Sequence, residues 1–310
     1  MTSEIIDSHV HLYPPEINRA PAAWAAAHSE PHWSLLCTRS RKNGRPVQTF
    51  PDTAALLRAM DAAGVTRAIL QAWYWETPES CALQNAFYAG CIRLHPDRLS
   101  ACAALPPRAG AARLRDEIRR AADAGFAGLG ELSPHSQNIT ANDPALHAAF
   151  ALAGEHNLAV NLHVTESAGE AGARNYPGKI ATPLADFVAW AQAHPRTRFV
   201  LAHWGARLPF DAAQGPAARA AKNIYYDTAA SPLTYGARSA ALWREMTDAA
   251  AGGAGADRIL FGTDYPLVLY PKTETEPTMT TLIAEARASG LDARALALIF
   301  SENAKRAYAL

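Results

Sequence analysis

Residues 199–205 read FVLAHWG and residues 259–266 read ILFGTDYP, and each stretch is a short apolar run that ends on a polar side chain. Similar runs recur along the chain, separated by Ala-rich segments that carry the start and stop signals of helices. Strands that are apolar throughout are typical of a parallel sheet covered by helices. The predicted strands are Glu4–Val10, Arg67–Ala72, Leu99–Ala104, Ala127–Glu131, Ala159–His163, Phe199–His203, Ile224–Asp227 and Ile259–Gly262.

This alternation predicts an α/β fold, a (β/α)8 TIM barrel, formed by a single domain over residues 1–310. Only the first interval between strands is far longer than the roughly 30 residues of a βα unit. We therefore expect an insertion after strand one, at residues 13–50, and we expect this loop to lie over the active face. An open doubly wound sheet is the alternative, but no glycine-rich nucleotide-binding motif follows any predicted strand.

The composition argues against several classes of partner and location. Lys and Arg number 29 and Asp and Glu number 29, so a net charge of zero gives no reason to expect nucleic acid or an anionic membrane. The sequence has no apolar stretch of about 18 residues and no signal-peptide pattern at its start. Four scattered cysteines favour a reducing, cytoplasmic location. A small molecule is the expected partner, and the Ala-rich outer helices leave a homo-oligomer open.

Side chains that can bind a metal stand at the carboxyl ends of the predicted strands, where barrels build their active sites. His9 and His11 are two residues apart, so on a strand they point to one face. Two buried imidazoles are costly unless a divalent metal uses their lone pairs. The predicted metal ligands are His9, His11, Glu131, His163, His203 and Asp264.

Each of these residues also has an ordinary structural explanation. His163 alone would be read as a core histidine, Asp264 as a helix N-cap, and Glu131 as the partner of a rim arginine. Their common position at strand ends favours a metal site over these alternatives. Imidazole ligands favour zinc, while manganese, iron and nickel remain open, with one or two ions.

The order of these motifs resembles the amidohydrolase superfamily of metal-dependent barrels. The phrases DSHVHLYP, HPDRLSACAALPP, FVLAHWG, ILFGTDYP and SENAKRAYAL are similar to its amidohydrolase-related branch, which includes aminocarboxymuconate-semialdehyde decarboxylase. The resemblance implies that His9, His11, His163 and Asp264 bind a divalent metal. It implies that His203 binds a second metal or polarises the substrate, and that Asp264 handles the proton of the reacting water.

The sequence differs from the decarboxylases of this family at Glu131, because the decarboxylase-like members often lack a carboxylate after strand four. A Glu there is similar to TatD-like nucleases and other two-metal members, where it is a ligand. This favours a two-metal site and hydrolysis of a lactone, ester or amide in a small, carboxylated molecule through a metal-activated water. The alternatives are a decarboxylase or hydratase of a carboxylated aromatic or muconate-like acid, a TatD-like phosphoesterase, and a barrel that binds a ligand without turnover.

Loops that follow the strands supply the predicted substrate contacts, which are Trp73, Trp75, His135, Trp204 and Arg207. Trp204 and Arg207 rank first because they directly follow a predicted ligand, whereas Trp73 and Trp75 could equally pack between barrel and helices. The insertion adds aromatic and cationic residues that would suit a carboxylated ring. Its TRSRKNGR segment, residues 38–45, could also be a solvated turn.

Overall fold

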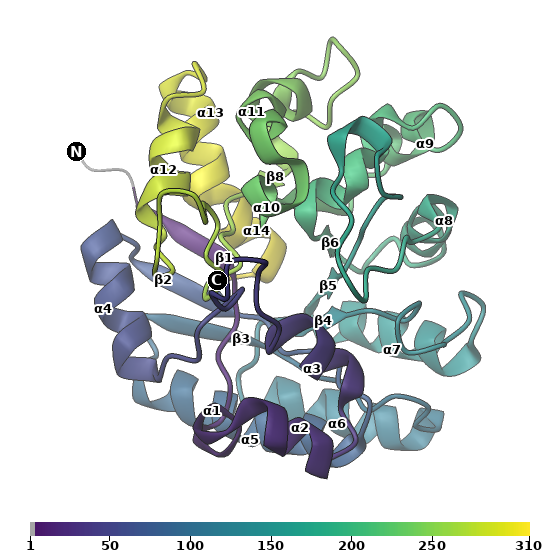
Figure 1. The fold of residues 1–310 in the computed structure, drawn as a ribbon. Coiled ribbons are helices and arrows are strands. Elements are labelled where there is room, and N and C mark those ends of the chain that lie inside the picture. The colour runs from purple at the N-terminus through teal and green to yellow at the C-terminus, as the bar shows by residue number, and fades with distance from the viewer. Residues whose placement is uncertain (1–3) are drawn as a thin grey trace.

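The computed structural model describes residues 4–310 and contains eight parallel strands in sequence order, so the predicted (β/α)8 barrel is confirmed (Figure 1). Residues 1–3 of the predicted domain lie outside the described residues. Every predicted strand is present, with ends shifted by a few residues. The strands are β1 (Ile6–Val10), β2 (Arg67–Leu70), β3 (Leu99–Ala103), β4 (Gly128–Leu132), β5 (Ala159–Leu162), β6 (Phe199–Leu201), β7 (Ile224–Asp227) and β8 (Ile259–Leu260).

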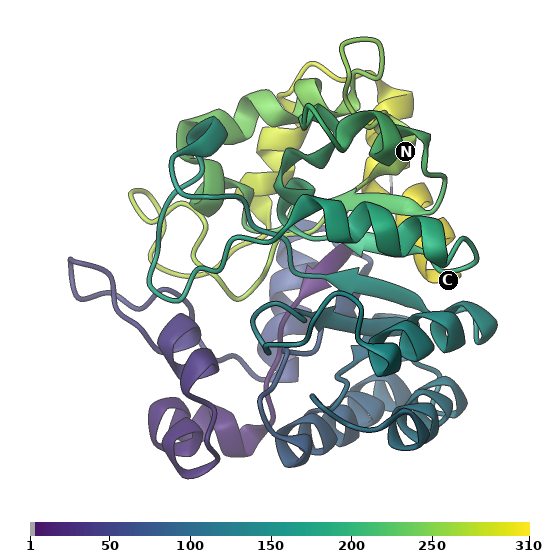
Figure 2. The ribbon, with the colours of Figure 1, turned by 90° about the vertical axis from the view of Figure 1, so that its right-hand side faces the viewer.

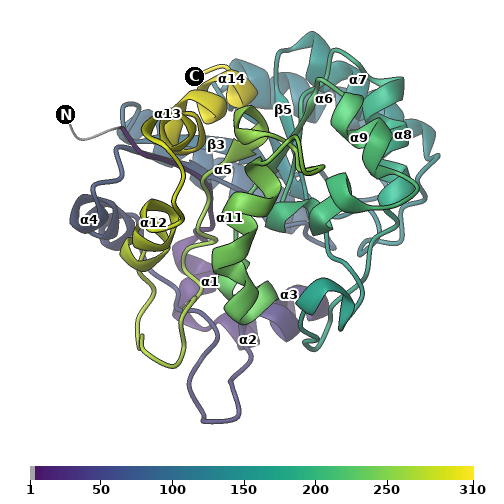
Figure 3. The ribbon, with the colours of Figure 1, turned by 90° about the horizontal axis from the view of Figure 1, so that it is seen from above.

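Helices surround the strands on the outside of the barrel (Figures 1 and 3). Their starts follow the sequence signals: the Asp143 carboxylate caps α7, whose first residue is Pro144. Between residues 4 and 310, no helix is both long and apolar enough to cross a membrane. The helices that follow the inserted segment are α4 (Thr53–Ala63), α5 (Pro78–Leu94), α6 (Ala111–Asp123), α7 (Pro144–Glu155), α8 (Leu184–Ala193), α9 (Gly215–Ala220), α10 (Ser231–Tyr235), α11 (Ser239–Thr247), α12 (Thr280–Arg287), α13 (Ala293–Ala297) and α14 (Asn303–Tyr308).

Short helical turns complete the connections between these elements. They are the 3₁₀ segments η1 (Glu170–Gly172), η2 (His203–Phe210), η3 (Gly236–Arg238) and η4 (Ala256–Arg258), and the π-helical turn η5 (Leu298–Glu302).

The segment between β1 and α4 forms three short helices, α1 (Pro15–Arg19), α2 (Pro21–Ala27) and α3 (Pro31–Cys37), followed by an extended arm. Figure 2 shows this segment, in purple, to one side of the barrel, with the arm projecting outward. An aromatic cluster fastens the helices to the barrel: the rings of Trp24 and Trp33 each lie 5.5 Å from the ring of Trp75. The arm is joined to the loop after β8 by a bridge between Gln48 and Leu267.

Hydrogen bonds between β1 and the segment after β8 close the barrel. The amide of Ser8 donates to the carbonyl of Phe261 at 2.8 Å, and the amide of Asp264 donates to the carbonyl of His9 at 2.8 Å. The buried carboxylate of Asp7 accepts from the amide of Thr263 at 3.0 Å and from its hydroxyl at 2.6 Å. The closure therefore sets the backbone of His9 directly beside that of Asp264.

Gly130, inside β4, is required by the close approach of β5. Its φ is +127°, and a Cβ there would lie 2.5 Å from the carbonyl oxygen of Asn161. We expect Gly130→Ala to lower the free energy of unfolding by about 2–3 kcal/mol, since it adds a clash and an unfavourable φ. Urea denaturation would measure this change.

The matched control is Gly90→Ala in α5, where a Cβ meets nothing within 4 Å. Alanine in a helix should raise the free energy of unfolding by roughly 0.5–1 kcal/mol. If the two variants were equally stable, the strain assigned to Gly130 would be refuted.

Candidate metal centre and active-site cavity

Two clusters of metal-binding side chains face each other at the carboxyl ends of the strands. One contains His9, His11 and Asp264, and the other contains Glu131, His163 and His203. Within each cluster the candidate ligand atoms all lie within 4.8 Å of one another. The structure thus brings together all the side chains predicted as metal ligands.

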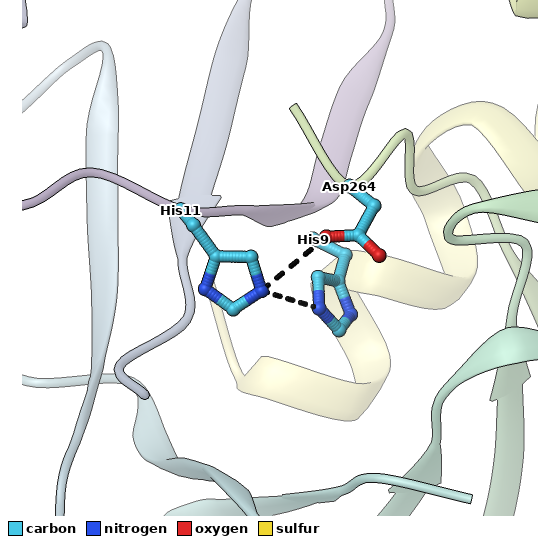
Figure 4. Close-up of side chains that lie close together, drawn as sticks. All are labelled: His9, His11 and Asp264. Atoms are coloured by element: carbon cyan, nitrogen blue, oxygen red, sulfur yellow. Dashed lines mark hydrogen bonds and ion pairs between the residues drawn. The ribbon is translucent and has the colours of Figure 1, made fainter. Parts of the chain in front are cut away.

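The first cluster joins β1 to the loop after β8 (Figure 4). The Nε2 atoms of His9 and His11 are 3.1 Å apart, and His11 Nε2 lies 3.4 Å from Oδ1 of Asp264. The alternation of side chains along β1 turns both imidazoles inward, as their spacing predicts.

Glu131 connects the two clusters through its two carboxylate oxygens. Its Oε2 lies 3.8 Å from Nε2 of both His9 and His11. Its Oε1 lies 2.8 Å from Nδ1 of His163 and 3.5 Å from Nε2 of His203. One carboxylate therefore offers a separate oxygen to each pair of imidazoles.

Hydrogen bonds behind the imidazoles determine which ring nitrogen has the lone pair. Nδ1 of His11 contacts the carbonyl oxygen of Gln71 at 2.8 Å, and Nδ1 of His203 contacts that of Ala229 at 3.0 Å. A carbonyl only accepts, so each Nδ1 carries the proton and each Nε2 presents a lone pair to the centre. Contacts of this kind orient histidine ligands in metal sites.

His9 has a carboxylate behind it: its Nδ1 lies 2.9 Å from Oδ2 of Asp227. With a proton on Nδ1, the Nε2 lone pair of His9 faces that of His11 at 3.1 Å. Two lone pairs at this distance repel unless a second proton on one ring or a metal cation lies between them. The donor set of imidazole nitrogens and carboxylate oxygens therefore fits a divalent metal.

The local charge also suits a cation. Burial lowers the pKa of His9, but the negative charge of Asp227, with those of Glu131 and Asp264, raises it to about 10. Burial raises the pKa of Glu131, but His163, His203 and His9 hold it well below its ordinary value. Glu131 is thus ionised at neutral pH, and its negative charge favours a cation at the centre.

A left-handed turn after β6 aims His203 at the centre. His203, Trp204, Gly205, Ala206 and Arg207 all have φ between 50° and 61°. The amide of His203 donates to Oδ1 of Asp227 at 3.1 Å, which holds the start of the turn. A side chain at Gly205 would meet the Tyr226 ring at 2.5 Å, so only glycine fits there.

A cavity of about 470 Å³ opens above the metal-binding side chains. Its floor contains His11, Glu131, His163, His203 and Asp264. Its upper wall comes from the segment after β1 and from the loop after β5, which together contribute Leu36, Cys37, Arg39, Ser40, Arg41, Lys42, Val47, Gln48, Arg174, Asn175, Tyr176 and Pro177. The inserted segment therefore borders the cavity that contains the predicted ligands.

Of the predicted substrate contacts, the structure brings Trp73 to the cavity wall. Trp75 lies outside the cavity: it is fully buried, and its Nε1 donates to Gln84. Trp204 is also fully buried, and its Nε1 donates to the Ser231 hydroxyl at 2.7 Å. The two tryptophans thus fasten the insertion and the left-handed turn.

His135 and Arg207 also lie outside the lining of the cavity. Nε2 of His135 contacts the carboxylate of Asp186 at 2.9 Å, which joins the loop after β4 to α8. The guanidinium of Arg207 lies 3.7 Å from the carboxylate of Glu245 and 5.2 Å from the ring centre of Phe210. Both side chains connect elements on the outside of the site.

Two residues at the site were missed in the sequence. Asp227 is the last residue of the strand predicted at 224–227, so its position at a strand end was the available signal. Tyr74 lies between Trp73 and Trp75 and lines the cavity, with its ring 5.3 Å from that of His163. No sequence pattern distinguishes Trp73 and Tyr74, which line the cavity, from Trp75, which does not.

Comparison with known proteins identifies relatives of this fold. A family model described as Amidohydrolase matches residues 6–310. The chain is similar to 5-carboxyvanillate decarboxylase from Sphingomonas paucimobilis, with a TM-score of 0.74 and 18% identity over 100% of both chains. It is similar to a probable 2-pyrone-4,6-dicarboxylic acid hydrolase from Acinetobacter baumannii, with a TM-score of 0.66 and 15% identity over 99% of this chain and 100% of that chain.

A further similar structure is 5-carboxyvanillate decarboxylase from Novosphingobium aromaticivorans, complexed with manganese and 4-hydroxy-3-methoxy-5-nitrobenzoic acid. Its TM-score is 0.68, with 16% identity over 100% of this chain and 97% of that chain. At identities of 15% to 18%, the similarity to these structures shows a shared fold and nothing further.

The contact between Asp227 and His9 gives a test of the metal centre. We expect Asp227→Asn to weaken metal affinity by about 10- to 100-fold, because the uncharged amide no longer holds the His9 tautomer. Titration with zinc or manganese against a competing chelator would measure this affinity. Asp186→Asn, which alters the partner of His135 outside the cavity, is the matched control. Equal affinities in the two variants would remove Asp227 from the centre.

Proposed function

The chain belongs to the amidohydrolase family, and we propose that it is a metal-dependent hydrolase that cleaves a lactone, ester or amide bond in a small carboxylated molecule. The observation that carries this proposal is the position of Glu131 between two pairs of imidazoles, on the floor of a cavity that Asp264 also lines. Such a floor would present a cation site and a carboxylate to the same bound molecule.

The proposed metal ligands are His9, His11, Glu131, His163, His203 and Asp264, which could hold one or two ions. We propose zinc because most of the donors are imidazole nitrogens. Manganese is the alternative, and a similar structure contains it. When bound, a divalent cation would polarise a carbonyl oxygen and make water more acidic.

Asp264 is the proposed proton carrier of the reaction. The amide nitrogen of Asp264 donates to the carbonyl oxygen of His9 at 2.8 Å, which fixes the backbone of Asp264, and its carboxylate borders the cavity. It would accept a proton from the attacking water as the oxygen adds to the carbonyl carbon, and return that proton to the departing alkoxide or amine. His203, whose Nδ1 lies 3.9 Å from Oδ2 of Asp264, would donate from a protonated Nε2 to the carbonyl oxygen where it does not bind a metal.

The walls of the cavity suit a flat, negatively charged molecule. Trp73, Tyr74 and Tyr176 offer aromatic surface, and Arg39 and Arg174 contribute positive charge. An arginine binds a carboxylate through two parallel hydrogen bonds. These features support a carboxylated substrate, which could contain a ring.

A second candidate function is decarboxylation of a carboxylated aromatic acid. It is favoured by similar structures described as 5-carboxyvanillate decarboxylases, one of them complexed with a substituted benzoic acid. The bond from the ring to its carboxylate would break with release of carbon dioxide, and the ring carbon would take a proton from Asp264. Product analysis separates the two functions. Hydrolysis gives a new carboxylate together with an alcohol or an amine, whereas decarboxylation gives carbon dioxide.

Asp264→Asn tests the proton transfer in either reaction. We expect kcat to fall by about 10³-fold, because an amide cannot carry the proton. The assay would use a panel of lactones, such as 2-pyrone-4,6-dicarboxylate, and of carboxylated phenols, with detection of ring-opened acid and of carbon dioxide. Metal content and thermal unfolding would confirm an intact centre, and near-normal turnover would refute the role of Asp264.

Metal content tests the connecting role of Glu131. We expect about two divalent ions per chain in protein purified without chelator, and one or fewer in Glu131→Gln, because each carboxylate oxygen faces a different pair of imidazoles. Elemental analysis would give these values. Glu155→Gln, at a partly exposed ion pair with Arg196, should leave the content unchanged. An unchanged content in Glu131→Gln would remove Glu131 from the set of ligands.

A further inference from the structure

The last helix of the chain, α14, packs against the barrel on the side opposite the cavity. Figure 2 shows the C-terminus on the other side of the barrel from the inserted segment, which borders the cavity. Tyr308 in this helix is buried, with 1% of its surface exposed. Its side chain belongs to a buried cluster with residues of the strands, which are Ile6, Ile69, Cys102, Ala159, Val200, Tyr225 and Leu260.

The hydroxyl of Tyr308 accepts hydrogen bonds from two side-chain amides inside the barrel. Nε2 of Gln71, directly after β2, donates to it at 3.0 Å, and Nδ2 of Asn161, in β5, donates to it at 3.3 Å. Both amide side chains are fully buried. One oxygen from the C-terminal helix therefore connects two strands that lie apart in the sheet.

The other contacts of each amide fix its orientation. Nε2 of Gln71 also donates to the carbonyl oxygen of Ser8 at 2.8 Å, and Nδ2 of Asn161 also donates to Oδ2 of Asp227 at 3.2 Å. Carbonyl and carboxylate oxygens accept hydrogen bonds, so an amide oxygen in either position would be repelled. Each amide nitrogen thus directs one hydrogen to Tyr308 and the other to the first or the seventh strand.

Both amides belong to residues that support the imidazoles of the centre. The Oδ2 atom of Asp227 that binds Asn161 also lies 2.9 Å from Nδ1 of His9. The main-chain carbonyl oxygen of Gln71 lies 2.8 Å from Nδ1 of His11. Contacts of this kind direct the lone pair of a histidine toward its metal. An unbroken series of hydrogen bonds therefore leads from Tyr308 to His9.

We propose that Tyr308 is a positioning residue of the metal centre, which acts through Asn161 on the contact between Asp227 and His9. The proposal rests on the metal centre of the proposed function and adds a residue that lies outside the cavity. The hydroxyl gives the nitrogen of Asn161 a second acceptor, so the amide keeps one hydrogen on the carboxylate of Asp227. Without the hydroxyl, a buried amide hydrogen loses its partner, and the amide is free to turn away from the carboxylate.

Tyr308→Phe tests the proposal, because phenylalanine keeps the buried ring and removes the hydroxyl alone. We expect the affinity for zinc or manganese, titrated against a competing chelator, to fall by about 3- to 10-fold, since Tyr308 acts one contact further from His9 than Asp227 does. Nuclear magnetic resonance of the imidazole nitrogens in metal-depleted protein gives a second readout. The Nδ1 resonance of His9 should shift, because its contact with Asp227 changes.

Thr197→Val is the matched control. It removes a buried hydroxyl that donates to the carbonyl oxygen of Phe150 at 2.7 Å, and neither residue lines the cavity. Thermal unfolding would compare the loss of stability in the two variants, and Thr197→Val should leave the metal affinity and the His9 resonance unchanged. An equal loss of affinity in both variants would reduce the effect of Tyr308 to stability and overturn the proposal. An unchanged affinity and His9 resonance in Tyr308→Phe would overturn it as well.

A double-mutant cycle with Asp227→Asn tests the route. If Tyr308 acts through this carboxylate, adding Tyr308→Phe to Asp227→Asn should weaken metal binding by less than about 2-fold, whereas additive losses would refute the route. Metal binding that depends on Tyr308 in a protein that hydrolyses no substrate would support the positioning role and count against the proposed function. If the native chain bound no divalent ion, the proposed function would fail, and the His9 resonance in Tyr308→Phe would still decide the role of the hydroxyl.

Discussion

The closure of β1 onto the segment after β8 is the constraint on which the rest of the site depends. The amide of Asp264 donates to the carbonyl of His9, and the carboxylate of Asp7 binds both the amide and the hydroxyl of Thr263. These bonds set the two inward imidazoles of β1 beside Asp264. The remaining proposed ligands lie in or directly after strands whose order is fixed by the same closed sheet.

A buried carboxylate also lies behind the side chains that face the centre. Asp227, which is fully buried, contacts His9 from behind and also accepts from the amide of His203, so one carboxylate orients a ligand from each cluster. Asn161 donates to the same carboxylate at 3.2 Å. A buried carboxylate is tolerated where several donors satisfy it, and here those donors also determine the direction of the imidazole lone pairs.

The sequence predicted the barrel and the side chains that the structure gathers at the centre, because strand ends are visible as the points where apolar runs stop at His, Glu or Asp. It could not assign the residues beyond those ends, where the chain leaves the regular pleat. Trp204 follows a ligand directly, yet a left-handed turn directs it into the core. In the aromatic run 73–75, Trp73 and Tyr74 line the cavity and Trp75 does not. Only the fold distinguishes these neighbouring aromatic residues. The resemblance to the amidohydrolase superfamily added roles for the ligands but gave no information about Tyr74 or Arg39.

The proposed ligands come from β1, from β4 and from the segments directly after β1, β5, β6 and β8, and the contact between Asp7 and Thr263 joins residues 256 positions apart. No continuous fragment of the chain therefore contains the site, and a partly folded chain that lacks either end of the barrel holds an incomplete set of ligands. Ion binding at the proposed cluster of His9, His11 and Asp264 would report complete folding, because that cluster is assembled only in the closed barrel. Long-range contacts of this kind also slow folding. A nascent chain could thus complete the cluster of His9, His11 and Asp264 only after its last strand has joined the first.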